Sequence, residues 1–336
     1  MEKQGLNTGV IATLSGLEEI RDEWTELWKK CGWATPFQAP QWLIPWWRHF
    51  GKEGLFTVTV RTGGRLTGLA PFFIYSPLSD IRRMIFIGTG ISDYLDILFE
   101  PGSAEIVAEA ILDRLLKSAS MWDRCELDEL RAGSPLLTLK APEGFDIRIS
   151  DADICPFIKL PQRAGELYSG LSPKYRRKVS KGKREMAATG GLRVEEACKA
   201  TLREFLTDLF ALHGARWGGE GLPGVLSDNN LQRFHFDAAE GLYDIGCLRL
   251  HRLVFKGENA AALYSLIKGG QVFCYLSGFE PKFGRFSPGR YLMAYAIERA
   301  IEEGFEIFDF MRGGEPYKYF WGAVNRVNYR FVLAGC

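Results

Sequence analysis

The sequence predicts a protein of mixed α/β class, built from two domains that repeat one order of helices and strands. Two observations support this prediction. With 336 residues, the chain is too long for one average domain but fits two, each large enough for its own hydrophobic core. Segments with the apolar spacing of helices also alternate with the short apolar runs typical of strands, as expected for helices packed on a sheet.

The first predicted domain, residues 1–155, begins with amphipathic helices and continues into strands. A Gly-Gly pair at 63–64 marks a turn between two of the strands. The aromatic segment 42–47 is expected to pack in the core, because two helices must cover one face of the sheet. The expected elements are helices at 17–30 and 41–50, strands at 55–60 and 66–74, a helix at 104–118, a strand at 125–130, a short helix from 134 and a strand at 144–149.

The second predicted domain, residues 156–336, repeats this order. The boundary falls near residues 150–161, where Asp and Pro residues precede a fresh start of the pattern. Each half is expected to form a mixed sheet flanked by helices. The expected elements are helices at 202–217 and 229–240, strands at 245–250, 260–267 and 271–276, a helix at 288–303, a strand at 307–311, a short helix at 315–321 and a strand at 328–333.

Composition and charge exclude several classes of function. The net charge of +1 gives no overall attraction to nucleic acid or anionic membrane, so any basic site must be local. The seven Cys are scattered without a C-x-x-C pair, and the four His lie far apart, so neither a metal site nor a disulfide framework is expected. No P-loop, G-x-S-x-G or H-E-x-x-H motif occurs, which removes the commonest nucleotide-hydrolase, serine-hydrolase and metalloprotease readings.

The expected location is the cytoplasm. The first 20 residues contain no apolar stretch of signal-peptide length, and no apolar run approaches the roughly 20 residues of a spanning helix. Scattered free Cys are typical of a reducing compartment. We therefore expect no integral membrane segment and no DNA partner.

Several short segments match motifs of known acyltransferases. They are Thr35–Gln38 with Trp42, Gly88–Gly90 followed by Ser92–Asp96, Leu171–Lys174, Leu212-His213 with Arg216-Trp217, Tyr275–Phe279, Phe308–Gly313, and Tyr317-Lys318 with Trp321–Ala323. The order of elements resembles the GNAT acyltransferase fold, and two such units in one chain resemble the FemAB/FemX peptidyltransferases. The motifs themselves look most similar to the CelD-type (cellulose-biosynthesis-associated) acetyltransferase-domain proteins. The resemblance covers nearly the whole chain.

A helix start in the second half is the predicted donor site. Ser287 is a good N-cap and Pro288 suits the first helical position, so the free N–H groups of this end would favour a phosphate. Arg285, Gly289 and Arg290 complete the predicted binding site for acyl-CoA. A well-capped helix without a ligand is the alternative. The corresponding helix of the first half begins at 99–105 with two Glu, which would repel a phosphate.

A dense basic run at 174–184 is a second candidate for phosphate binding. Lys174, Arg177, Lys178 and Lys181 would share one face at helical spacing, and Arg176 adds further charge. Like charges this close repel one another, so a phosphate-bearing partner is plausible. The alternative is a solvated surface, which is the usual place of a charge run.

Residues 88–96 are the candidate acceptor site. Asp93, Tyr94 and Asp96 follow a Gly-Thr-Gly segment, and two carboxylates beside an aromatic ring could position and deprotonate an amine or hydroxyl. Asp and Gly also form turns, so a simple turn is the alternative. His213, alone on a predicted helix, is expected to be structural.

Lys318 is the leading candidate for catalysis. It lies among aromatic residues, where a lysine either reaches solvent with its stem packed or is held as a partly desolvated charge. The resemblance implies the second role, because the lysine of the matching FemX-like segment stabilises charge on the transferring carbonyl. Tyr317 is assigned to substrate binding, and Asp309 and Glu315 are weaker candidates for the general base.

The sequence therefore predicts an N-acyltransferase of GNAT type. An amine, or less favourably a hydroxyl, of a cell-envelope sugar, polysaccharide precursor or peptide would attack acyl-CoA directly, without a covalent enzyme intermediate. Two alternatives stay open. One is a FemX-like peptidyltransferase that uses aminoacyl-tRNA. The other is an inactive GNAT relic that binds a polysaccharide or a partner protein.

Overall fold

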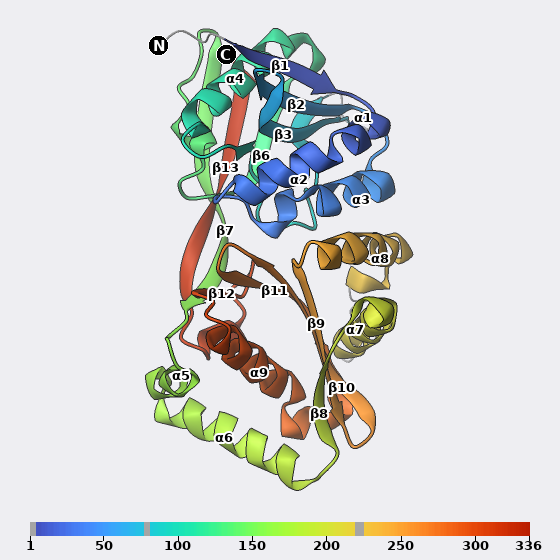
Figure 1. Ribbon diagram of the computed structural model, residues 1–336. Helices are drawn as coiled ribbons and strands as arrows, with labels where there is room; N and C mark the ends of the chain where they lie inside the picture. The colour runs from blue at the N-terminus through green and yellow to red at the C-terminus, as the bar shows by residue number, and fades with distance from the viewer. Residues whose placement is uncertain (1–4, 77–80, 219–224) are drawn as a thin grey trace. The chain divides into compact units, whose positions relative to one another are not determined.

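The structure is a computed structural model, and it describes residues 5–76, 81–218 and 225–336. The chain divides into two compact units (Figure 1). The first consists of Met1–Ile154 together with Arg326–Cys336, and the second of Cys155–Asn325. The C-terminal segment thus belongs with the first unit, although the sequence placed it in the second domain.

The first unit contains a mixed sheet with helices on both faces. Its strand order is β1-β2-β3-β4-β6-β13, with β5 beside β3. The pairs β1–β2, β2–β3, β3–β4, β3–β5 and β6–β13 are antiparallel, whereas β4 and β6 run parallel. The elements are β1 (Leu6–Ile11), α1 (Leu14–Glu19), α2 (Arg21–Lys30), α3 (Pro40–Phe50), β2 (Leu55–Thr62), β3 (Arg65–Tyr75), β4 (Arg83–Phe86), β5 (Leu98–Phe99), α4 (Ala104–Lys117), β6 (Arg124–Arg131), the start of β7 (Phe145–Lys159) and most of β13 (Val324–Gly335).

Aromatic side chains fill the core of the first unit. Trp24 of α2 and Trp42 of α3 are completely buried, and Trp46 and Trp47 are nearly so, which confirms core packing of the aromatic segment. On the other face, a Cβ at Gly68 of β3 would collide with Val107 of α4, so the glycine permits close helix packing. Burial of such large rings is the main stabilising contribution to this core.

The second unit has the same kind of sheet. Its strand order is β7-β12-β11-β10-β9-β8, and β11 with β12 is its parallel pair. The elements are the end of β7, α5 (Ala164–Gly170), α6 (Pro173–Ala188), β8 (Leu192–Glu196), α7 (Leu202–Gly218), α8 (Asn229–Asp244), β9 (Leu248–Phe255), β10 (Glu258–Lys268), β11 (Gln271–Phe279), α9 (Pro288–Glu302), β12 (Ile307–Asp309) and α10 (Pro316–Tyr319).

Helices cover both faces of this second sheet (Figure 1). Helix α7 lies so close to β11 that a Cβ at Gly278 would come within 2.4 Å of the His213 nitrogen. Only glycine fits this contact, which gives the Tyr275–Phe279 motif a packing role. Helix α9 covers the other face with fully buried Leu292 and Ile297. The predicted alternation of helices and strands, and the mixed sheets it builds, are confirmed.

Two long strands, β7 and β13, each cross the boundary between the units. Residues 157–159 of β7, which closes the first half, pair with β12 of the second unit. Residues 328–334 of β13, which closes the second half, pair with β6 of the first unit. The first sheet is therefore completed by a strand that follows the second unit in sequence, whereas β7 runs from the first unit into the second.

Candidate active site

The candidate site lies where two parallel strands of the second unit separate. Strands β11 and β12 pair only at Gln271–Phe273 with Ile307–Asp309. Beyond this point β12 ends, while β11 continues to Phe279 and carries a bulge, because the register with β10 shifts between Tyr264 and Ser265. Bulges of this kind bend a strand and redirect its side chains.

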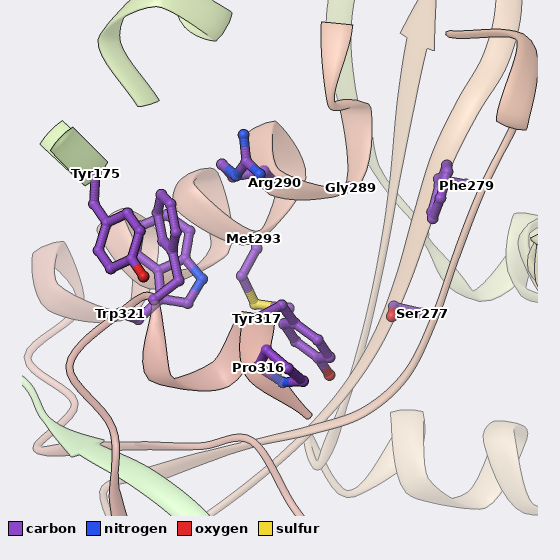
Figure 2. A pocket seen from close by; sticks show the side chains of 10 residues that line it. Tyr175, Ser277, Phe279, Gly289, Arg290, Met293, Pro316, Tyr317 and Trp321 are labelled. Carbon is purple, nitrogen blue, oxygen red and sulfur yellow. The ribbon is translucent and has the colours of Figure 1, made fainter. Parts of the chain in front are cut away.

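A cavity of about 320 Å³ opens at this separation. Its walls come from β11, the first turns of α9, the α10 segment and one residue of α6. Figure 2 shows Arg290 on α9 with Met293 below it, Tyr175 and Trp321 on one side, and Ser277 and Phe279 on the opposite side. The lining residues are Tyr175, Ser277, Phe279, Gly289, Arg290, Met293, Pro316, Tyr317, Phe320 and Trp321.

The cavity is aromatic and carries one charged group. No carboxylate lies among its lining residues, and no carboxylate of the described residues pairs with Arg290. The guanidinium lies 4.9 Å from the Phe320 ring centre and donates a 3.3 Å hydrogen bond to Ser287 Oγ. Burial lowers the pKa of Arg290, because it removes water from the charged group. The site therefore offers an uncompensated positive charge to an anion.

The start of α9 supplies further donors beside Arg290. Ser287 has φ 55°, and its side chain does not cap the helix. Sequence analysis predicted that Ser287 would cap the helix with its side chain, and this part of the prediction is wrong. Because the cap is open, the backbone N–H groups of Gly289 and Arg290 have no partner within the described residues. Free N–H groups at a helix start favour a negative charge. Arg285 lies outside the cavity, and its guanidinium stacks 4.5 Å from the Phe286 ring centre.

Several lining residues were missed by sequence reasoning. Tyr175 packs on Phe320 with a ring-centre distance of 4.3 Å, and Phe320 contacts Trp321 at 5.2 Å. Trp321 is only 4% exposed, yet its indole N–H has no hydrogen-bond partner among the described residues. Because Trp321 lines the cavity, this N–H is a candidate contact for a ligand.

Lys318 is buried just outside the cavity lining. Its side chain is 2% exposed, and Nζ donates to the carbonyl oxygens of Met311, Arg312 and Gly313 at 2.7–2.9 Å. Nζ also lies 2.8 Å from Glu315 Oε2. The lysine thus holds the 311–313 turn, in which Met311 has φ 65°. Its predicted role beside the reacting carbonyl stays a prediction.

The two candidate bases occupy different surroundings. Asp309 is completely buried, and its Oδ1 accepts a 2.8 Å hydrogen bond from the Met311 N–H. The Glu315 side chain is half exposed, and its carboxylate packs over Gly313. Neither lines the cavity, whereas Tyr317 does.

The candidate acceptor residues lie in the core of the first unit. Tyr94 is 1% exposed, Asp96 4% and Asp93 9%. Asp96 accepts hydrogen bonds from Trp33 Nε1 at 2.7 Å and from Ser134 Oγ at 2.9 Å. Burial raises the pKa of Asp96 to about 6. These bonds explain the segment as a packed loop, and its predicted contact with an acceptor stays a prediction.

The basic run forms helix α6, as its helical spacing predicted. Lys174, Arg177 and Lys178 are exposed, and none of them lines the aromatic cavity. Arg176 instead donates to the carbonyl oxygens of Tyr168 and Ser169, at 3.0 and 3.1 Å, and so caps the end of α5.

Three further expectations concern His213, metals and membrane helices. His213 is buried against β11, as a structural role would require. The side chains of Arg216 and Trp217 lie outside the described residues. Within the described ranges, His, Cys, Asp and Glu form no group of three suited to a metal ion. None of the helices in the described chain has the length and apolar character needed to cross a bilayer.

Comparison with known protein families finds a match, which lies within the second unit. Residues 173–319 match the family described as Acetyltransferase (GNAT) domain. None of the curated proteins matches the chain in sequence. The match covers somewhat less than half of the chain and shows similarity of this segment to GNAT acetyltransferases, while the CelD-type resemblance stays a prediction.

Solved structures give the fold of the whole chain. FemX aligns with a TM-score of 0.66 and 12% identity over 96% of each chain. A conserved protein of unknown function from Bacteroides thetaiotaomicron VPI-5482 aligns with a TM-score of 0.62 and 13% identity, over 98% of this chain and 100% of that one. L-PGS from Bacillus licheniformis aligns with a TM-score of 0.54 and 13% identity, over 79% and 80%. The predicted fold class, a tandem GNAT-like α/β protein, is confirmed.

Proposed function

We propose that this protein is an N-acyltransferase that moves an acyl group from acyl-CoA to an amine, or less favourably a hydroxyl, of a cell-envelope sugar, polysaccharide precursor or peptide. The observation that carries the proposal is the aromatic cavity at the separation of β11 and β12, with Arg290 and the open start of α9 on its wall. It lies within the segment that matches the GNAT acetyltransferase domain.

The donor would use the two kinds of wall differently. The CoA phosphates would lie at the N–H groups of Gly289 and Arg290 and at the Arg290 guanidinium, since charge-assisted bonds to phosphate are strong. The pantetheine arm and acyl group would lie against Met293 and the aromatic rings, where water is excluded. This division favours a ligand that is anionic at one end and apolar at the other.

The reaction would proceed by direct attack. The acceptor nitrogen forms a bond to the acyl carbon, the C–S bond of the thioester breaks, and the proton of the amine passes through a base to the departing thiolate. Glu315 is our preferred base, because its carboxylate is partly exposed next to the cavity residues Pro316 and Tyr317. The cavity would contribute by holding the two reactants in place.

A binding experiment tests the donor assignment. We expect calorimetry to show acetyl-CoA binding that is weakened about tenfold or more in Arg290→Glu, which replaces an attractive charge by a repulsive one. Lys117→Glu, an equal charge reversal at an exposed site on α4, is the control and should bind as the parent does. Unchanged affinity in Arg290→Glu would overturn the donor site.

Thermal shifts with three ligands separate the proposed function from its alternatives. A ligand that binds only the native state raises the melting temperature. Stabilisation by CoA supports acyl transfer from CoA. Stabilisation by bulk tRNA alone would favour transfer from aminoacyl-tRNA, and no stabilisation by either would favour a protein that only binds a polysaccharide or a partner.

A further inference from the structure

Helix α6 carries a concentration of positive charge that the chemistry of the cavity does not use. Its 16 residues include seven Lys or Arg and a single Glu, in a chain whose net charge is +1. We call the exposed members of its outer face the basic stripe. The stripe consists of Lys174, Arg177, Lys178, Lys181 and Arg184.

The charges of the stripe are poorly compensated inside the protein. No carboxylate of the described residues pairs with Lys174, Arg177 or Lys178, and these three lie in the first two turns of α6. Cations at a helix N-terminus face the positive end of the helix dipole, which is unfavourable. An external polyanion along this helix, about 24 Å long, would offset that cost.

A second cavity adjoins the start of the stripe. It measures about 410 Å³ and is lined by the end of β7, by α5 and by residues 321–324. Gly170 and Leu171 line it, and Ser172 caps α6 directly after them. Its apolar wall consists of Phe157, Ile158, Leu167, Leu171, Trp321 and Val324. Val324 is 58% exposed, which is unusual for an apolar side chain beside a cavity.

The combination of an apolar cavity and a basic stripe favours one class of partner. We infer that α6 docks the second unit onto an anionic phospholipid bilayer, with headgroup phosphates on the stripe and an acyl chain in the cavity beside Val324. The inference is independent of the proposed acyl transfer.

Nucleic acid is the competing polyanion, and two observations disfavour it. Single-stranded nucleic acid is held by aromatic rings on which bases stack. The only aromatic residue of α6, Tyr175, already packs on Phe320 at 4.3 Å. The cavity at the start of the stripe is also mainly apolar, although Lys159 and Glu166 line it too, and this suits a hydrocarbon chain better than a sugar-phosphate.

Vesicle binding tests the stripe. The full chain should sediment with vesicles of equal parts phosphatidylglycerol and phosphatidylcholine, and much less with phosphatidylcholine alone. The variant Lys174→Glu/Arg177→Glu/Lys178→Glu should lose roughly 100-fold in partitioning, because each basic residue near an anionic surface contributes about a factor of five. Acidic residues in the first turns also suit the helix dipole, so melting of α6 would not explain a loss.

The matched control has the same change in net charge elsewhere. Lys52→Glu/Lys117→Glu/Lys140→Glu reverses three exposed charges of the first unit and should keep at least most of the binding. Equal losses in both triple variants would show that only net charge matters, and would overturn the inference. Absence of sedimentation with the anionic vesicles would overturn it as well.

A second variant tests the cavity. Val324→Asn should weaken binding to the anionic vesicles several-fold without changing its salt dependence, because it removes an apolar contact and no charge. Ile106→Asn, a similar change at a 42% exposed site on α4, should leave binding unchanged. Equal binding by both variants would remove the acyl chain from the proposal. Bulk tRNA could also be added to the vesicle-bound protein. If tRNA releases the protein at a concentration lower than the lipid concentration needed for binding, the stripe is a nucleic-acid surface instead.

Discussion

In each unit a parallel strand pair separates after two or three residues, β4 from β6 in the first and β11 from β12 in the second. The first unit fills the separation with its own loop, residues 87–97. Ser92 accepts a 2.9 Å hydrogen bond from the Trp42 indole, and Gln38 Nε2 donates to the Tyr94 carbonyl oxygen at 3.0 Å. The second unit instead leaves the aromatic cavity beside Arg290.

The comparison shows how a repeated fold can keep one site and close the other. In the first unit the indoles of Trp33 and Trp42 are bonded to the loop, whereas the Trp321 indole of the second unit has no partner among the described residues. The helix that follows also differs. Glu100 before α4 pairs with Arg65 at 2.9 Å, so its carboxylate already compensates the cation that an anion would need there. Packing, rather than topology, decides which unit keeps a cavity.

The largest effect is expected when Lys318, which holds the 311–313 turn of the second unit, is replaced. Lys318→Met should lower the free energy of unfolding by about 3 kcal/mol, because three carbonyl oxygens, one of them in a buried hydrogen bond, lose their donor. Chemical denaturation measures this change. The first unit offers the comparison, since Glu129 there has φ 62° and is held by Asn328 Nδ2 at 2.8 Å.

Activity of the same variant sharpens the result. Lys318→Arg keeps the charge, but its fork cannot reproduce three bonds from one nitrogen, so it should recover only part of the stability. A Lys318→Met protein of unchanged stability that has lost turnover would contradict a purely structural lysine and support the predicted catalytic role.

The next effect is a change of stability with pH, and it concerns Asp96 in the loop 87–97 of the first unit. Burial raises the pKa of Asp96 from 3.8 to about 6. The folded state therefore binds more protons than the unfolded state between about pH 4 and 6, so the contribution of Asp96 to stability is full below pH 4 and is lost as pH rises through 6. The expected loss is about 3 kcal/mol.

Urea unfolding of the parent and of Asp96→Asn at pH 4.5 and pH 7 measures this difference. The parent should lose stability relative to Asp96→Asn on going to pH 7, because the amide cannot ionise. A difference between the two proteins that is the same at both pH values would mean that Asp96 does not titrate in this range.

The smallest effect closes the open site by design. Ser277→Trp places a large ring in the cavity, as the first unit does with its own side chains, and should weaken acetyl-CoA binding about tenfold or more. Thermal unfolding should stay near that of the parent, because Ser277 is only half buried. Ser120→Trp, at an exposed position of the first unit, is the control. Full affinity in Ser277→Trp would place the donor elsewhere.

Sequence patterns located most helices and strands, and the remaining differences have physical causes. The aromatic helix α3 and the helices α4, α7 and α9 follow from amphipathic spacing. Strand β1 was not predicted, because its residues Leu6–Ile11 contain no buried side chain and so show little alternation. Strand β8 was missed for the same reason. The pairing of β13 with β6 joins residues far apart in sequence, which local patterns do not encode.

The candidate site was only partly predictable. Gly289, Arg290 and Tyr317 were predicted as binding residues, and all three line the cavity. Helix capping and charge, which are visible in the sequence, led to the prediction at the start of α9. Phe279, Met293 and Phe320 were missed, because an apolar residue on a cavity wall has the same local pattern as one in a core. The reverse error affects Asp96, whose carboxylate suggests chemistry but whose partners make it part of a packed loop.

The pairing of β13 with β6 has a consequence for synthesis on the ribosome. Strand β6 obtains its neighbour β13 from residues 328–334, which are made only after the second unit. Until then the nascent first unit has an open sheet edge, and such edges invite pairing with other chains. A fragment ending near Ile154 would keep that edge permanently and should aggregate. Linking the missing β13 sequence to its end would be the way to obtain the first unit alone.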